Sequence, residues 1–197
     1  QMQPLIEAAI DAGDIPPVTT VTPSAGLSYY LDSHDGSERW ETLLVHELPE
    51  ALPVDRECML VTGISMGGVG TLRLSFRNPT KFRACASLEA GVDPFLTLAD
   101  MPDWYKGMAN TRLGPKFGDP IDEAFWRANN PANIAAEAPS RLVESGLKIY
   151  LEVGTDDGLY NHHNVEFLHR VLFDHGIKHE YRTCLLYTSP SPRDSIA

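Results

Sequence analysis

The 197-residue sequence predicts an α/β fold, with a mostly parallel sheet and helices on both faces. Short apolar segments without alternation recur along the chain, which is typical of strands that are buried on both sides. Segments with apolar residues at helical spacing separate them, and each pair of parallel strands needs such a crossover. In sheets of this kind the chemistry gathers at the carboxyl ends of the strands.

The first part of the chain is predicted to form a helix, a strand and a second helix. Residues 2–12 carry apolar side chains at helical spacing. Residues 15–21 are rich in β-branched side chains and favour a buried strand. The helical period returns over residues 37–52, with Ser37 as an N-cap candidate and Pro53 as a stop.

The remaining strands are predicted from continuous apolar segments. They cover residues 58–64, 82–88, 147–153 and 178–182. A helix follows the first of these segments and ends at Asn78-Pro79, and another covers residues 160–175 with Gly176 as its C-cap. Residues 92–140 show no long periodic stretch, so we expect a lid-like excursion over the sheet, with short helices near 119–127 and 139–145. Residues 1–183 are expected to form a single domain.

Composition and charge exclude several classes of protein. The chain is 43% hydrophobic and 22% charged, as ordinary globular domains are, so disorder of the bulk is excluded. Asp and Glu number 27 against 16 Lys and Arg, which gives a formal net charge of −11. Such a chain repels phosphate backbones and anionic lipid, so we expect neither nucleic acid nor membrane as a partner.

No segment of the sequence is typical of membrane insertion or secretion. The longest apolar runs fall far short of the ~20 residues that cross a bilayer, and the start lacks the basic and apolar regions of a signal peptide. We expect a soluble protein, with the cytoplasm as the favoured compartment. Cys58, Cys85 and Cys184 are odd in number and far apart, which favours core residues or free thiols over disulfides or a zinc site.

The motif that carries chemistry is Gly63-Ile64-Ser65-Met66-Gly67, a G-x-S-x-G sequence between a predicted strand and a predicted helix. This context is that of a nucleophile elbow, a sharp turn that projects a serine hydroxyl above the sheet. Ser65 is therefore the candidate nucleophile, and Gly63 and Gly67 supply the lack of bulk that the turn needs. The N–H of Met66, at a helix N-terminus, points to where an oxyanion would form. The alternative is a glycine-rich turn without catalysis.

An aspartate that orients the catalytic base is expected in a loop after a later strand. Residues 154–160 follow the predicted strand 147–153 and precede a helix, which places them at the same sheet edge as Ser65. Asp156 and Asp157 both qualify. Either one could instead be the N-cap of the following helix.

The chain resembles the α/β-hydrolase esterases grouped with S-formylglutathione hydrolase (esterase D) and the mycobacterial mycolyltransferases. The resemblance runs from Leu5 to about Arg182 and includes residues 15–18, 28–32, 40–48, 63–68, 78–82, 154–160 and 176–182. It implies an α/β-hydrolase fold with Ser65 as nucleophile. It also implies Asp157 as the acid, because the family's acid is the aspartate directly before the two residues that precede Tyr160.

Both ends of the chain depart from the family pattern. In the family the general base is a histidine in a loop just after the strand that Tyr181 and Arg182 begin, whereas residues 183–194 hold no histidine. Residues 184–197 are expected to be a non-native or disordered tail, and a genuine polar tail is the alternative. The family's His-Gly loop, which gives the second oxyanion N–H, precedes the helix with which this chain begins. The resemblance therefore predicts an incomplete hydrolase fold, without the N-terminal strands and the C-terminal histidine loop.

The seven histidines offer few other candidates for the base. His162 and His163 are close to Asp157 in sequence, but a helix start would keep them on the loop of the acid. Together with His169 they could suggest a metal site, yet no Cys or carboxylate set stands at ligand spacing. Surface histidines of a helix are the simpler interpretation, and we expect no metal or other cofactor.

The predicted function is that of a serine carboxylesterase or thioesterase that acts on a small-molecule acyl ester or thioester through an acyl-enzyme. The alternatives are acyl transfer, as in the mycolyltransferases, and a catalytically dead binding module. Aromatic residues of the excursion suit either an apolar acyl group or the excursion's own core: Trp104, Tyr105, Phe117, Phe125 and Trp126. With two triad members and one oxyanion donor, this chain by itself is expected to be nearly inactive.

Overall fold

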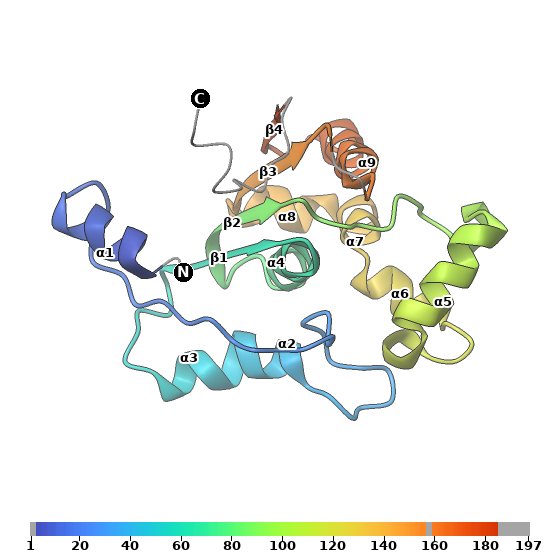
Figure 1. Ribbon diagram of the computed structural model, residues 1–197, viewed down its shortest axis with the longest axis horizontal. Helices are drawn as coiled ribbons and strands as arrows, with labels where there is room; N and C mark the ends of the chain where they lie inside the picture. Colours follow the sequence, from blue (N-terminus) through green and yellow to red (C-terminus); the bar gives the residue numbers. More distant parts are fainter. Residues whose placement is uncertain (1–2, 157–158, 185–197) are drawn as a thin grey trace.

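The computed structural model describes residues 3–156 and 159–184, and its centre is a four-stranded parallel sheet (Figure 1). The strands lie side by side in sequence order: β1 (Met59–Ile64), β2 (Phe82–Leu88), β3 (Lys148–Gly154) and β4 (Glu180–Cys184). Each neighbouring pair is parallel. The predicted α/β fold is confirmed, and the four strands predicted after residue 58 are all present, close to their predicted ranges.

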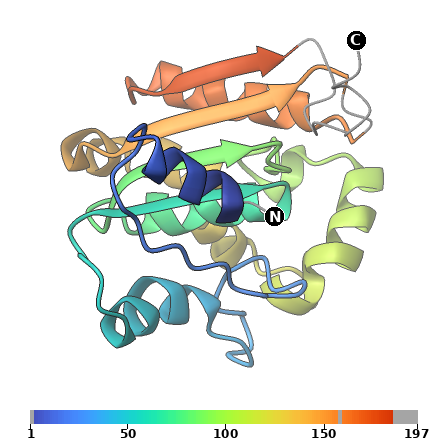
Figure 2. The same ribbon diagram turned by 60° about the vertical axis from the view of Figure 1, so that its left-hand side comes forward.

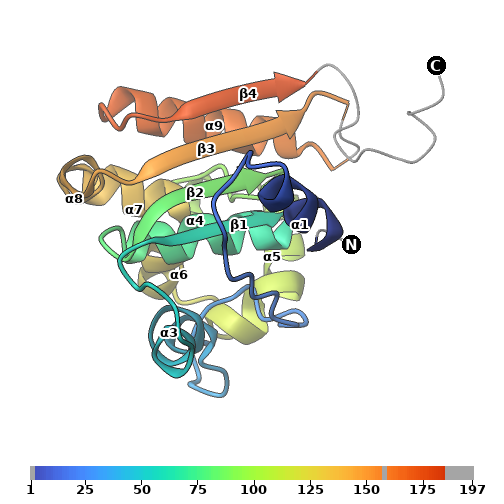
Figure 3. The ribbon, with the colours of Figure 1, turned by 90° about the vertical axis from the view of Figure 1, so that its left-hand side faces the viewer.

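Helices flank the sheet on both sides but cover one face much better than the other (Figure 1, Figure 3). The covered face packs against α4 (Met66–Arg77), α7 (Pro131–Glu137) and α9 (Asn161–Asp174). On the opposite side lies α1 (Gln3–Asp11), which has no buried residue. Leu60 and Ile64 of β1 are consequently 64% and 53% exposed, although the sequence led us to expect strands buried on both sides.

The main core lies between the sheet and the three helices of its covered face. Leu72 and Phe76 of α4, Leu151 of β3, and Leu168 and Leu172 of α9 are almost completely buried there. Fully burying a side chain of this size contributes about 1.5–3 kcal/mol. This core fixes the register of the strands and so the positions of the loops at their carboxyl ends.

The strand predicted over residues 15–21 is not formed, and that prediction is wrong. The segment is exposed, and among the described residues it pairs with no strand. Pro16 and Pro17 have no N–H to donate to a strand ladder, which weakens any strand at this place.

The helix predicted over residues 37–52 is present in three consecutive pieces. They are α2 (Trp40–Thr42), a π-helical turn η1 (Leu43–Glu47) and α3 (Leu48–Ala51). The wide turn is followed by Leu48 and then Pro49, which lacks the N–H that a regular α-helix would use there.

The excursion between β2 and β3 is helical and has its own core. Figure 2 shows its longest helix, in yellow-green, beyond the carboxyl ends of β1 and β2. The helices of the excursion are η2 (Leu98–Asp100), α5 (Asp103–Phe117), α6 (Glu123–Asn129) and α7. The next helix, α8 (Pro139–Ser145), begins where the excursion ends. The short helices predicted near 119–127 and 139–145 are present as α6 and α8. The 15-residue helix α5 was not among the helices predicted for this segment. Gly107 and Gly114 lower its helix propensity and dilute its periodicity.

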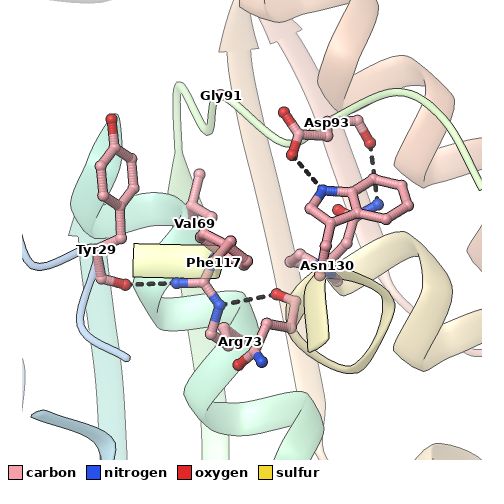
Figure 4. Close-up of a pocket in the computed structure, with 10 residues that line it drawn as sticks. Tyr29, Val69, Arg73, Gly91, Asp93, Phe117 and Asn130 are labelled. Carbon is pink, nitrogen blue, oxygen red and sulfur yellow. Dashed lines mark hydrogen bonds between the residues drawn. The ribbon is translucent and has the colours of Figure 1, made fainter. Parts of the chain in front are cut away.

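The core of the excursion, here named the second core, also includes a residue of the loop before α2. Its buried members are Leu31, Met101, Tyr105, Ala109, Phe117 and Trp126. The buried guanidinium of Arg73 ties this unit to α4, since its Nε–H donates to the Asn129 carbonyl at 2.7 Å and another N–H donates to the Tyr29 carbonyl (Figure 4). Burial lowers the pKa of Arg73 to about 10 while Asp93 opposes that shift, so the group keeps its charge at neutral pH.

Three further expectations concern membrane helices, the cysteines and the C-terminal tail. Within residues 3–156 and 159–184, no helix is both long and apolar enough to cross a membrane. The three cysteines are free thiols, as expected, and burial raises the pKa of the Cys85 thiol to about 11. Cys184 is the last residue of β4. Residues 185–197 lie outside the described residues, so the proposed domain boundary at 183 and the tail stay predictions.

Candidate active site

Ser65 occupies a sharp turn between a strand and a helix. β1 ends at Ile64 and α4 begins at Met66, and Ser65 between them has φ 56° and ψ −117°. A positive φ is strained for a serine, so the surrounding contacts must hold it. Two of them are backbone hydrogen bonds: the Ser65 N–H donates to the Leu88 carbonyl at 2.9 Å, and the Ser65 carbonyl accepts from Val69 at 3.1 Å. Ser65 itself is exposed. This is the geometry of a nucleophile elbow.

The two glycines of the motif differ in how much room the turn leaves for a side chain. A Cβ on Gly63 would lie 2.4 Å from the carbonyl oxygen of Gly67, a distance that real Cβ atoms do not reach. Among the described residues, a Cβ on Gly67 would meet only the hydroxyl of Tyr30, at 3.9 Å. The steric requirement therefore falls on Gly63, whereas the sequence assigned it to both.

Two further glycines of α4 were not singled out from the sequence. A Cβ on Gly68 would lie 2.7 Å from the Leu88 carbonyl, and one on Gly70 would lie 2.6 Å from the ring of Tyr30. The Ser87 hydroxyl also donates to the Gly68 carbonyl at 3.0 Å. The first two turns of α4 are thus pressed against the end of β2 and against Tyr30. The run Gly67-Gly68-Val69-Gly70 was the available signal, because helix interiors rarely hold so many glycines.

Tyr29 and Tyr30 form a second strained backbone segment next to α4. Their φ values are 53° and 57°. The Tyr30 N–H donates to Ser28 Oγ at 3.1 Å, and the Tyr29 carbonyl accepts from Arg73. These contacts press the Tyr30 ring onto Gly70, with its hydroxyl toward Gly67 near the start of the helix.

The loop proposed to carry the acid begins at the same edge of the sheet. β3 ends at Gly154, and the Thr155 N–H donates to the Cys184 carbonyl of β4 at 2.8 Å. Asp156 is exposed, and it is not the N-cap of α9, because Tyr160 occupies that position with φ 58°. Asp157 lies outside the described residues, so its role stays a prediction.

In the part of the chain that the structure describes, no hydrogen bond joins a histidine to Ser65. The rings of His162 and His163 lie at the start of α9 with centroids 4.0 Å apart. His169 Nδ1 and His179 Nε2 are hydrogen-bonded at 2.7 Å. In the same described part, no three His, Cys, Asp or Glu side chains are grouped as a metal site.

The aromatic residues of the excursion form its own core for the most part. Tyr105, Phe117 and Trp126 are buried, and Phe125 packs against them. Asp93 fixes two of them, because its carboxylate accepts from the Tyr105 hydroxyl at 2.7 Å and from Trp126 Nε1–H at 2.8 Å. The second of these hydrogen bonds is drawn in Figure 4. The cavity beside Asp93 has a free volume of about 10 Å³, which is room for one water molecule at most and too little for an acyl group. Only Trp104, at 71% exposure, is left open to a ligand among the five named aromatic residues.

Comparison with known proteins agrees with this fold. A family model described as "Putative esterase" matches residues 1–181. The chain belongs to this esterase family. One relative is the S-formylglutathione hydrolase of Mus musculus, 29% identical over 140 residues that make up 67% of this chain and 44% of the relative. Another is the diacylglycerol acyltransferase/mycolyltransferase Ag85B of Mycolicibacterium smegmatis, 31% identical over 126 residues, or 59% of this chain and 37% of the relative.

Solved structures of the family show the same α/β-hydrolase fold. A ferulic acid esterase matches with a TM-score of 0.66 at 19% identity, covering 92% of this chain and 68% of its own. The S-formylglutathione hydrolase from Agrobacterium tumefaciens matches with a TM-score of 0.61 at 21% identity, covering 79% and 54%. The predicted resemblance is confirmed. The chain spans less than half the length of the two relatives compared by sequence.

Proposed function

We propose that the intact protein is a serine hydrolase that cleaves small-molecule acyl esters or thioesters through an acyl-enzyme. The observation that carries this proposal is the strained turn at Ser65, between the end of β1 and the start of α4. The turn exposes the serine at the carboxyl edge of the sheet. The N–H of Met66 belongs to the first turn of α4, where backbone N–H groups lack partners within the helix. A carbonyl above the turn can therefore meet a nucleophile and an oxyanion donor together.

The reaction follows from these positions. Ser65 Oγ attacks the acyl carbon and gives its proton to a general base, while the Met66 N–H stabilises the negative charge on the carbonyl oxygen. The bond from carbon to the leaving oxygen or sulfur breaks, and the leaving group takes the proton from the base. Water then attacks the acyl-enzyme, with its proton going to the same base. The carboxylic acid leaves, and the proton returns to Ser65.

We further propose that Asp157 orients this base. The described part of its loop supports the assignment, since it starts at the carboxyl end of β3, two strands away from β1. In the resembled family the base is a histidine. It is the triad member that we do not find beside Ser65 among the described residues.

Hydrolysis of p-nitrophenyl acetate by the intact protein tests the proposal. Ser65→Ala should reduce turnover to background, and Asp157→Asn should lower kcat by about 10⁴, because the base then loses the correct tautomer. Asp156→Asn is the matched control and should cost far less. If the two aspartate effects were reversed, the acid would be Asp156. Unchanged turnover in Ser65→Ala would refute the proposed function.

Acyl transfer to an alcohol is the second candidate, favoured by the relative described as a mycolyltransferase. It differs from hydrolysis only in which nucleophile reaches the acyl-enzyme. Product analysis in the presence of a sugar alcohol separates the two: free acid indicates hydrolysis, and a new sugar ester indicates transfer.

A further inference from the structure

The end of β2 lies between the two loops that carry the proposed catalytic groups. β1 and β3 are both neighbours of β2, so the turn at Ser65 and the loop after Gly154 stand two strand spacings apart, about 10 Å. A base that contacts both Ser65 and the acid must bridge this gap. The width of this gap depends on how each of the two loops is attached to the end of β2.

On the side of β1, the attachment is through the backbone of the last residue of β2. The Leu88 carbonyl accepts the hydrogen bond from the Ser65 N–H at 2.9 Å. A Cβ on Gly68 would lie only 2.7 Å from the oxygen of the same carbonyl. The nucleophile turn is therefore pressed directly onto β2.

On the side of β3, the attachment is through the next residue, Glu89. Its N–H donates to the Glu152 carbonyl at 2.9 Å, which continues the parallel ladder. In a regular ladder the N–H of Gly154 would then donate to the carbonyl of Glu89. Instead it donates to the side chain, with Oε1 of Glu89 accepting at 2.8 Å. A carboxylate thus replaces a backbone acceptor at the place where β3 ends and the acid loop begins.

The backbone of Glu89 is strained in the same sense as that of Ser65. Its φ is 51°, against 56° for Ser65 and 58° for Tyr160. Ser65 directly follows β1, Glu89 directly follows β2, and Tyr160 follows β3 at the start of α9, so a non-glycine residue with positive φ stands beyond each of three adjacent strands. Glycine would adopt this conformation without strain, and backbone strain of this kind collects at functional sites. A glutamate here is explained by what its carboxylate does.

We propose that Glu89 is a positioning residue of the active site, whose carboxylate fixes the start of the acid loop, residues 154–160, at a set distance from Ser65. The proposal rests on the proposed function. Gly154 is buried, so its N–H must find an acceptor. Without the carboxylate, Gly154 must shift to find another acceptor, and the start of the loop moves with it.

Three variants of Glu89 in the intact protein separate positioning from simple stabilisation. Glu89→Gly removes the carboxylate and also the strain, so it should lower kcat for p-nitrophenyl acetate ~10- to 100-fold without lowering Tm. Glu89→Gln keeps an oxygen that can accept from Gly154 and should stay within about threefold of the parent kcat. Glu89→Ala lacks the carboxylate and keeps the strain, so it should lose both kcat and Tm. KM should stay unchanged in all three, since the substrate contacts remain.

The opposite results overturn the proposal. Parent kcat in Glu89→Gly would show that the carboxylate positions nothing. A loss in Glu89→Gln as large as that in Glu89→Ala would show that the charge of Glu89 matters and its hydrogen bond to Gly154 does not. Ser65→Ala, measured alongside, shows which proposal has failed. Its turnover stays at the parent level only if the proposed function itself is wrong.

A second readout does not depend on activity. Amide hydrogen exchange of the peptide containing Gly154 and Thr155 should become faster in Glu89→Gly and stay at the parent rate in Glu89→Gln. Ser65→Ala, which leaves this hydrogen bond in place, is the control. Equal exchange in the parent and Glu89→Gly would refute the hydrogen bond itself.

Discussion

The turn at Ser65 and the excursion over residues 92–140 both stand at the carboxyl side of the sheet, but they are held in different ways. The turn is fixed by backbone contacts, both within the motif, where Gly63 lies against Gly67, and across to the Leu88 carbonyl of β2. The excursion is fixed by side chains far apart in sequence, such as Asp93 with Tyr105 and Trp126. A local motif can therefore predict the turn, whereas the excursion depends on the tertiary fold.

The largest effect that separates the two regions is expected for Gly63→Ala. The added methyl group would lie 2.4 Å from the Gly67 carbonyl, so the turn must open, at a cost of about 3 kcal/mol in unfolding free energy. Reactivity of Ser65 should be lost as well. Gly67→Ala is the matched control, since its methyl group has room, and urea unfolding should place it within about 0.5 kcal/mol of the parent. Equal losses in both variants would contradict the steric account.

A smaller effect is expected in the excursion for Asp93→Asn. The amide can accept from only one of the two donors that now share the carboxylate, and it leaves the other buried donor unpaired, which costs about 2 kcal/mol. Tyr105→Phe removes one of the two hydrogen bonds and should cost about 1 kcal/mol. Both should leave the reactivity of Ser65 in place. Urea unfolding measures the cost, and loss of Ser65 labelling in Tyr105→Phe would show that the two regions are coupled.

Gly70→Ala probes the contact between α4 and Tyr30 and should have a smaller net effect than Asp93→Asn. The methyl group would lie 2.6 Å from the Tyr30 ring, but alanine is the better helix former by about 1 kcal/mol, so the net loss is about 1 kcal/mol. In a Tyr30→Ala background the clash disappears and the same change should stabilise. Additive effects of the two substitutions would rule out the contact.

The smallest effect concerns the pH dependence of stability at α9. Burial, followed by the nearby His179 and Arg170, lowers the pKa of His169 from its usual 6.5. The unfolded chain then binds this proton at a higher pH than the folded chain, so stability falls as the pH drops below about 6.5. His169→Phe keeps an aromatic ring on Tyr181 and should flatten the dependence of Tm on pH between 7 and 5. His46→Phe, at an exposed position, should leave that slope unchanged.

The sequence predicts the parts of this fold that depend on local pattern. The four strands, α4, α9 and the turn at Ser65 follow from continuous apolar segments, helical spacing and one motif. It fails where contacts distant in sequence decide. Residues 15–21 have strand-like composition but no strand partner among the described residues, and α5 has weak periodicity yet buries Tyr105 and Phe117 in the second core.

The candidate site divides in the same way. Ser65 and Gly63 could be found from the motif, because the turn needs that spacing. Glu89 and Tyr30 could not, since no pattern near them shows that one contacts Gly154 and the other Gly70. Such residues are visible only once the strands are placed side by side.

Mapping the site of covalent labelling by a fluorophosphonate tests the central claim most directly. The probe reacts with serines that are activated as nucleophiles, and peptide mass spectrometry of the labelled intact protein identifies the modified residue. We expect one adduct, on Ser65, and none in Ser65→Ala, while Gly67→Ala remains labelled. An adduct on another residue, or labelling that survives in Ser65→Ala, would contradict the assignment of Ser65 as the nucleophile.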